Sequence, residues 1–219
     1  MSRDVRYVLF DLGGVVVRTP FELVPALESR RGLSEGSLGL HGPFDPGRDE
    51  LWRRRVDGEV TERHYWRHHA TRLTNDASIE TDDPTRWLMQ EIYDVAEDVI
   101  VRPEVVALLD RLDAGGLGIA ALTNDLSRFH DAEWIERIAA LDRFDPLIDL
   151  SDLGTFKPDP VAYRHAIGVL GVAPDGVLFV DDQMENVAAA RREGIPTVFF
   201  DSTDVAASIA SIQSVLADI

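Results

Sequence analysis

A chain of 219 residues, 45% of them hydrophobic, can bury a substantial core, either as one large domain or as a domain that carries an insertion. The formal net charge of −17 opposes binding to nucleic acid or to an anionic membrane, and the absence of cysteine excludes disulfides, thiolate metal sites and a cysteine nucleophile. The N-terminus has no apolar signal-peptide core and no run approaches about 18 apolar residues, so we expect a cytoplasmic protein.

The first predicted element is a short apolar strand that ends in an acid. Residues Val8–Val17 read VLFDLGGVVV, and Asp11 follows the apolar run directly, before Gly13 and Gly14. Glycine allows the backbone to turn sharply at a strand end. The pattern therefore predicts a strand ending at Phe10 and a tight turn after it.

A long region of helical pattern follows, from about residue 21 to residue 101. It contains Trp52, Trp66 and Trp87 and has no convincing strand pattern. We therefore expect an α-helical subdomain inserted immediately after the first strand.

From residue 102 onward, helical segments alternate with short apolar runs. Glu104–Ala114 is predicted to be a helix, and glycines 115, 116 and 118 are expected to mark its C-terminal cap. The apolar runs are 117–123, 177–180 and 197–200. This alternation predicts an α/β fold: a doubly wound parallel-sheet (Rossmann-like) core formed by residues 1–17 and 102–219, with residues 18–101 as an inserted α-helical cap.

Polar residues follow each of the first predicted strands. Asp11 comes after the first strand, Thr123, Asn124 and Asp125 come at the end of the second, and Asp181 and Asp182 follow the strand at 177–180. The carboxyl ends of parallel strands lie along one edge of a sheet, so these groups are expected to converge on one crevice together with Lys157 from a nearby loop. The alternative is that they only cap strands or begin helices.

Four short motifs resemble those of the haloacid dehalogenase superfamily, in the subgroup with a helical cap after the first motif. They are FDLGGV at 10–15, LTN at 122–124, Lys157 in FKPDP, and FVDDQMEN at 179–186. Most members of that superfamily are phosphatases, and dehalogenases and phosphomutases are minorities. The four motifs occur in order and span nearly the whole chain.

The resemblance implies a role for each motif residue: Asp11 as nucleophile, Thr123 and Asn124 as phosphoryl-binding residues, Lys157 as the neutralising cation, and Asp182 with Asp181 as Mg²⁺ ligands. A carboxylate can attack phosphorus to form an aspartyl phosphate, and Mg²⁺ prefers hard oxygen ligands. The turn at Gly13 and Gly14 leaves the Gly13 carbonyl able to face the metal.

One position departs from the pattern of the phosphatases. Most of them carry a second aspartate two residues after the nucleophile, which serves as general acid and base, and this chain has Gly13 there. A cap histidine, Asp125 or a metal-bound water could replace it. A 2-haloacid dehalogenase is the first alternative, because halide leaves without a proton, although the paired acids Asp181 and Asp182 would disfavour a carboxylate substrate. A non-catalytic binding module is the second alternative.

Two cap segments could also carry function. His64 and His68 lie one helical turn apart, a spacing that can bind a metal, but no Glu follows His64 and a solvated helix face is the favoured interpretation. The run Trp52–Arg55 is expected to be an exposed face with Trp52 turned inward. We therefore expect a Mg²⁺-dependent hydrolase of a small phosphorylated metabolite, with sugar phosphates a reasonable class. The sequence assigns neither the substrate nor the oligomeric state.

Overall fold

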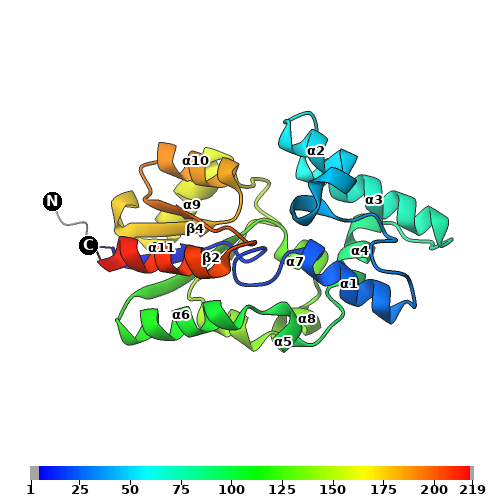
Figure 1. The fold of residues 1–219 in the computed structure, drawn as a ribbon. Helices are drawn as coiled ribbons and strands as arrows, with labels where there is room; N and C mark the ends of the chain where they lie inside the picture. The colour runs from blue at the N-terminus through cyan, green and yellow to red at the C-terminus, as the bar shows by residue number, and fades with distance from the viewer. Residues whose placement is uncertain (1–4, 218–219) are drawn as a thin grey trace. The chain divides into compact units, whose positions relative to one another are not determined.

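The computed structural model describes residues 5–217, which form two compact units (Figure 1). The first, here called the sheet unit, contains the chain up to Thr19 and from Val101 onward. The second, here called the insert unit, is Pro20–Ile100. The chain therefore leaves the sheet unit after the first strand, between Thr19 and Pro20. It returns between Ile100 and Val101, before the helix that leads to the second strand.

The sheet unit is built on a five-stranded parallel sheet with the order β3-β2-β1-β4-β5. The strands are β1 (Tyr7–Phe10), β2 (Gly118–Thr123), β3 (Leu147–Asp149), β4 (Val177–Asp181) and β5 (Thr197–Phe199). β1 lies in the centre, pairing with β2 on one side and β4 on the other. The chain thus winds outward in both directions from β1, and the predicted doubly wound α/β fold is confirmed.

Helices cover both faces of this sheet. α9 and α10 lie on one side, and α6, which contacts α11, lies on the other (Figure 1). Burial on both faces explains why the strands read as uninterrupted apolar runs. The helical segments of the sheet unit are α6 (Pro103–Ala114), α7 (Leu126–Phe129), α8 (Ala132–Arg137), η3 (Ala139–Arg143), α9 (Pro160–Leu170), η4 (Pro174–Gly176), α10 (Met184–Arg192) and α11 (Val205–Ala217).

The sequence analysis did not predict β3. This strand has only three residues, lies at an edge of the sheet and is only partly buried, so it carries too short an apolar pattern to be recognised.

The predicted cap of α6 at Gly115 is confirmed. The second strand begins at Gly118, where a Cβ would lie 2.4 Å from the Tyr7 ring, so glycine allows the close approach of β1 and β2.

The insert unit is helical, and no strand forms anywhere in 20–100, all of which is described. Its core includes a cluster of four aromatic side chains, Phe21, Trp52, Tyr65 and Trp66. The elements are α1 (Pro20–Arg30), η1 (Gly42–Phe44), η2 (Pro46–Arg48), α2 (Glu50–Val56), α3 (Glu62–Asp76), α4 (Pro84–Ile92) and α5 (Glu97–Ile100). Within residues 5–217, every helix is too short or too polar to cross a bilayer.

Candidate active site

The candidate site lies where three neighbouring strands end. Asp11 follows β1, Thr123 is the last residue of β2, and Asp181 is the last residue of β4. The backbone N–H of Asp11 donates to the carbonyl of Val180 at 2.8 Å, which fixes the first acid beside the end of β4. The parallel pairing therefore brings these residues to one edge of the sheet.

Lys157, the only lysine in the chain, joins two of these acids. It comes from the loop between β3 and α9 and is 4% exposed. Its Nζ lies 2.8 Å from Asp11 Oδ1 and 2.9 Å from Asp181 Oδ2. One buried ammonium thus holds two carboxylates that would otherwise repel each other.

Asp181 is fully buried, and both of its oxygens accept from protein donors. Oδ1 accepts from the Gln183 backbone N–H at 2.8 Å and from Asn186 Nδ2 at 3.0 Å. Oδ2 accepts from Lys157 Nζ at 2.9 Å and from Asn186 Nδ2 at 3.1 Å. Through these contacts Asp181 holds Lys157 in place. The assignment of Asp181 as a metal ligand stays a prediction. Sequence reasoning missed the part played by Asn186.

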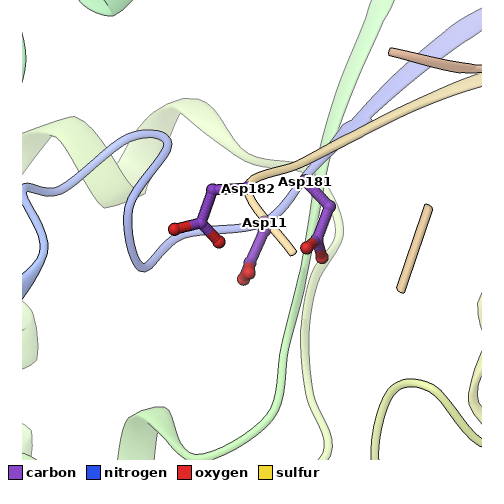
Figure 2. A group of neighbouring side chains, drawn as sticks. All are labelled: Asp11, Asp181 and Asp182. Atoms are coloured by element: carbon purple, nitrogen blue, oxygen red, sulfur yellow. The ribbon is translucent and has the colours of Figure 1, made fainter. Parts of the chain in front are cut away.

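Asp11, Asp181 and Asp182 form one acidic group, in which one ligand oxygen from each lies within 4.8 Å of the others. Figure 2 shows the three carboxylates pointing to the same side of the strand ends, with Asp11 between the other two in this view. Such a set of hard oxygen donors fits Mg²⁺. Gly14 packs against the group: it has φ +79°, and a Cβ there would lie 1.9 Å from Asp182 Oδ2. Glycine at this position is therefore required by both backbone and space.

The electrostatics of Asp11 depend on this crowding. Burial raises the pKa of its carboxyl to about 7, with a further raising effect from the charge of Asp181, while Lys157 and the Leu12 N–H oppose the shift. A second cation beside the carboxyl would favour its ionised form. The site therefore brings two buried carboxyl groups against one buried ammonium.

The two polar residues after β2 have different surroundings. Thr123 is 7% exposed at the strand end. Asn124 directs its carboxamide to the backbone of Lys157, accepting from the N–H at 2.8 Å and donating to the carbonyl at 3.2 Å. Asp125 is the N-cap residue of α7, and its side chain does not cap that helix. Phosphoryl binding by Thr123 and Asn124 remains a prediction.

Asp149 at the end of β3 is a further acid at this edge, opposite Thr123 in the strand register. Its carboxylate accepts from the N–H groups of Ser127 and Ser151 at 2.8 and 3.0 Å and from Ser151 Oγ at 2.6 Å. It thereby ties the segment after β2 to the end of β3. An acid at the end of a predicted strand was the sequence signal for the other site residues, and it would also have identified Asp149. It did not do so because β3 itself was not predicted.

Gly13 is exposed and has no positive φ, and a Cβ built on it would meet no atom within 4 Å. A side chain at this position, where most phosphatases of the superfamily carry their second aspartate, would therefore begin in open space. In the insert unit, His64 and His68 are exposed on α3 with ring centroids 6.4 Å apart, in keeping with a solvated helix face. Trp52 is buried, as expected, and the Arg55 guanidinium lies over its ring.

Comparison with known proteins now gives the family. The model of the haloacid dehalogenase-like hydrolases matches residues 5–194, so the chain belongs to this family of hydrolases. The family resemblance drawn from the four sequence motifs is confirmed.

The individual proteins and solved structures to which the chain is similar have different names. A phosphoglycolate phosphatase from Shigella dysenteriae is 28% identical over 207 residues, with 89% of this chain and 81% of that protein covered. The mouse acyl-CoA dehydrogenase family member 10 is 26% identical over 94% of this chain, which spans only 19% of that longer protein. A dehalogenase crystal structure has a similar fold, with a TM-score of 0.62, 19% identity, and 92% and 87% of the two chains covered.

Proposed function

We propose that the protein is a Mg²⁺-dependent phosphatase that hydrolyses small phosphomonoesters through an aspartyl phosphate on Asp11. The observation that carries this proposal is the position of Lys157 Nζ, which lies within 2.9 Å of both Asp11 and Asp181 at the edge of the sheet where Asp182 also lies. A carboxylate held beside a buried cation and further acids is suited to attack a phosphoryl group whose charge must be neutralised.

The contacts of Asp11 indicate which oxygen attacks. Oδ1 accepts from the Leu12 backbone N–H at 2.7 Å and from Lys157 Nζ at 2.8 Å. Both contacts are to Oδ1, so Oδ2 is assigned as the nucleophile. Its lone pair forms the bond to phosphorus while the bond to the leaving oxygen breaks. Water then attacks phosphorus, inorganic phosphate leaves and the Asp11 carboxylate is restored.

The residues that would hold Mg²⁺ are Asp11, Asp182 and Asp181, together with the backbone carbonyl of Gly13. When bound, the ion supplies positive charge for the phosphoryl oxygens and keeps Asp11 ionised. Lys157 acts on the same charges from the protein side, because its ammonium lies against Asp11 and its position is fixed by Asp181. Thr123 is proposed to donate its hydroxyl to the phosphoryl group.

The proposed substrate class is a small phosphorylated metabolite, with sugar phosphates as the first group to test. Support comes from the named phosphoglycolate phosphatases among the relatives, which match over most of both chains. The net charge of −17 makes binding of a phosphate dianion dependent on the local cations at the site.

A dehalogenase is the second candidate, favoured by one observation. The space beside Gly13 has no acid, and a halide ion leaves without a proton. Against it stand the three carboxylates at the strand ends, which would repel a carboxylate substrate. The third candidate is a binding module without turnover. Burying charged groups costs free energy, and this candidate gives no chemical reason for burying Asp11 and Lys157.

One assay separates the three. Purified protein is incubated with a panel of phosphomonoesters and with 2-haloacids, in Mg²⁺ and in EDTA. We expect phosphate release in Mg²⁺, its loss in EDTA and its recovery when Mg²⁺ is added back. Halide release that persists in EDTA would establish the dehalogenase. Saturable binding of a phosphate ester without turnover in Mg²⁺ would establish the binding module.

A further inference from the structure

The carboxamide of Asn124 binds both backbone groups of Lys157. Asn124 follows the last residue of β2, and Lys157 lies 33 positions further along the chain. Oδ1 accepts from the Lys157 N–H at 2.8 Å, and Nδ2 donates to the Lys157 carbonyl at 3.2 Å. One planar group therefore fixes both the place and the direction of the Lys157 backbone.

We propose that Asn124 is a positioning residue, whose carboxamide holds the Lys157 backbone so that Nζ reaches Asp11 and Asp181. The contact itself is independent of the activity, whereas its importance for turnover rests on the proposed function. This inference gives the Asn124 side chain a different task from the phosphoryl contact that the family resemblance implies.

The flexibility of lysine explains why such a brace is needed. Its long side chain has many rotamers, and ordering it costs conformational entropy. The Nζ contacts fix only the far end of Lys157, and the next residue, Pro158, has no N–H with which to anchor the loop. Removing the carboxamide would leave a buried N–H and a carbonyl of Lys157 without their observed partners.

The two adjacent residues Thr123 and Asn124 should therefore give different effects when they are changed. Asn124→Ala removes the brace, and Thr123→Val removes a hydroxyl while keeping the shape of the side chain. Asn124→Asp keeps the acceptor for the Lys157 N–H and loses the donor to its carbonyl. The three variants separate a residue that positions Lys157 from a residue that binds phosphate.

Because Lys157 is the only lysine, protein labelled with ¹⁵N-lysine gives a single lysine backbone amide signal by NMR. In the full chain without metal or substrate, we expect Asn124→Ala to shift this signal and to speed its exchange with solvent by about tenfold. Asn124→Asp should keep the amide protected, and Thr123→Val should leave the signal in place. A Lys157 amide that is unchanged in Asn124→Ala, or is unprotected in Asn124→Asp, would overturn the proposal.

Kinetics with p-nitrophenyl phosphate and Mg²⁺ supply the second measurement. We expect Asn124→Ala to lower kcat and to weaken inhibition by inorganic phosphate less than Thr123→Val does, because Asn124→Ala disturbs Lys157 but removes no direct contact with phosphate. Loss of phosphate inhibition in Asn124→Ala as large as in Thr123→Val would assign Asn124 to phosphate binding and contradict the inference. If the wild-type protein releases no phosphate while the amide results hold, the proposed function fails and the positioning role stands.

Discussion

Two buried carboxylates, one in each unit, have pKa values shifted in opposite directions. Burial and the charge of Asp181 raise the pKa of Asp11 to about 7, against the influence of Lys157. Asp49 in the insert unit is only 3% exposed, and its burial would also raise the pKa. Hydrogen bonds from the Tyr65 hydroxyl and from three backbone N–H groups outweigh that effect, and the pKa of Asp49 lies below its ordinary value.

The donors around each acid explain the difference. Asp49 accepts from Tyr65 Oη at 2.6 Å and from the N–H groups of His41, Gly42 and Trp52 at 2.9 to 3.2 Å, all of them neutral and fixed. The Asp11 carboxylate accepts from the Leu12 backbone N–H and from the Lys157 ammonium, and this ammonium also contacts the Asp181 carboxylate. A buried acid whose oxygens are filled by fixed donors stabilises the fold, whereas an acid with too few donors stays available for a cation and for reaction.

The largest effect is expected from Asp11→Asn, which keeps the shape of the side chain and removes its attacking charge. Turnover of a phosphomonoester in Mg²⁺ should fall by about four powers of ten or more. The measurement is phosphate release in single-turnover and steady-state assays, with circular dichroism to show that the variant is folded. Hydrolysis near the wild-type rate would rule out covalent catalysis by Asp11.

The next effect concerns stability. Asp49→Ala should lower the free energy of unfolding by about 3 kcal/mol, because it leaves the Tyr65 hydroxyl and three backbone N–H groups without their acceptor. Chemical denaturation followed by tryptophan fluorescence measures the loss. The control is Asp45→Ala, which breaks an exposed ion pair with Arg48 and should change stability by less than about 0.5 kcal/mol.

The sign of the Asp49 pKa shift adds a test by pH. A carboxyl whose folded-state pKa lies below its ordinary value stabilises the fold above about pH 4 and loses that contribution as the pH falls through the lower value. The stability difference between wild type and Asp49→Ala should therefore shrink below about pH 4. A difference that stays constant down to pH 2 would show that lost packing, and not the carboxylate, is responsible.

A smaller effect is expected in the pH dependence of Mg²⁺ binding. Because the pKa of Asp11 is raised to about 7, a Mg²⁺ ion bound as proposed would displace a proton below that pH. The apparent Mg²⁺ affinity should fall by up to about tenfold for each pH unit below 7 and level off above it. Calorimetric titration in two buffers of different ionisation enthalpy counts the released proton. Proton release that is equally large in Asp11→Asn would assign it to another group.

The sequence predicted most of the fold because its signals are local. Uninterrupted apolar runs mark buried parallel strands, and the acids at their ends can be placed on one edge without coordinates. What escaped prediction depends on contacts between distant segments. β3 is too short to show a pattern, so Asp149 went unnoticed, and the distinction between Asp181 and Asp182 rests on Asn186 and Lys157. The contact of Asn124 with a backbone 33 positions away also escaped prediction, because nothing in the local sequence indicates it.

Gly13 and Gly14 provide the finest comparison at the site, because they are neighbours with different constraints. Gly14 has φ +79° and no room for a Cβ beside Asp182, whereas Gly13 has neither restriction. Gly13→Asp should therefore fold without backbone strain and place a further carboxyl two residues after Asp11, where most phosphatases of the superfamily carry their general acid.

If the wild type has no general acid, its log(kcat/KM) should depend steeply on the pKa of the leaving group, favouring aryl, acyl and anomeric sugar phosphates. Gly13→Asp should then raise turnover of alkyl phosphates by about tenfold, below the full range of 10²–10⁴, because the new carboxyl is not tuned by its surroundings. Gly13→Asn is the matched control, since it has the same shape and no acidic proton, and it should give no gain. A shallow slope in the wild type would instead show that another group already donates the proton. Substitution of His64, His68 and Asp125 in turn would then identify it, because only loss of the true donor should make the slope steep.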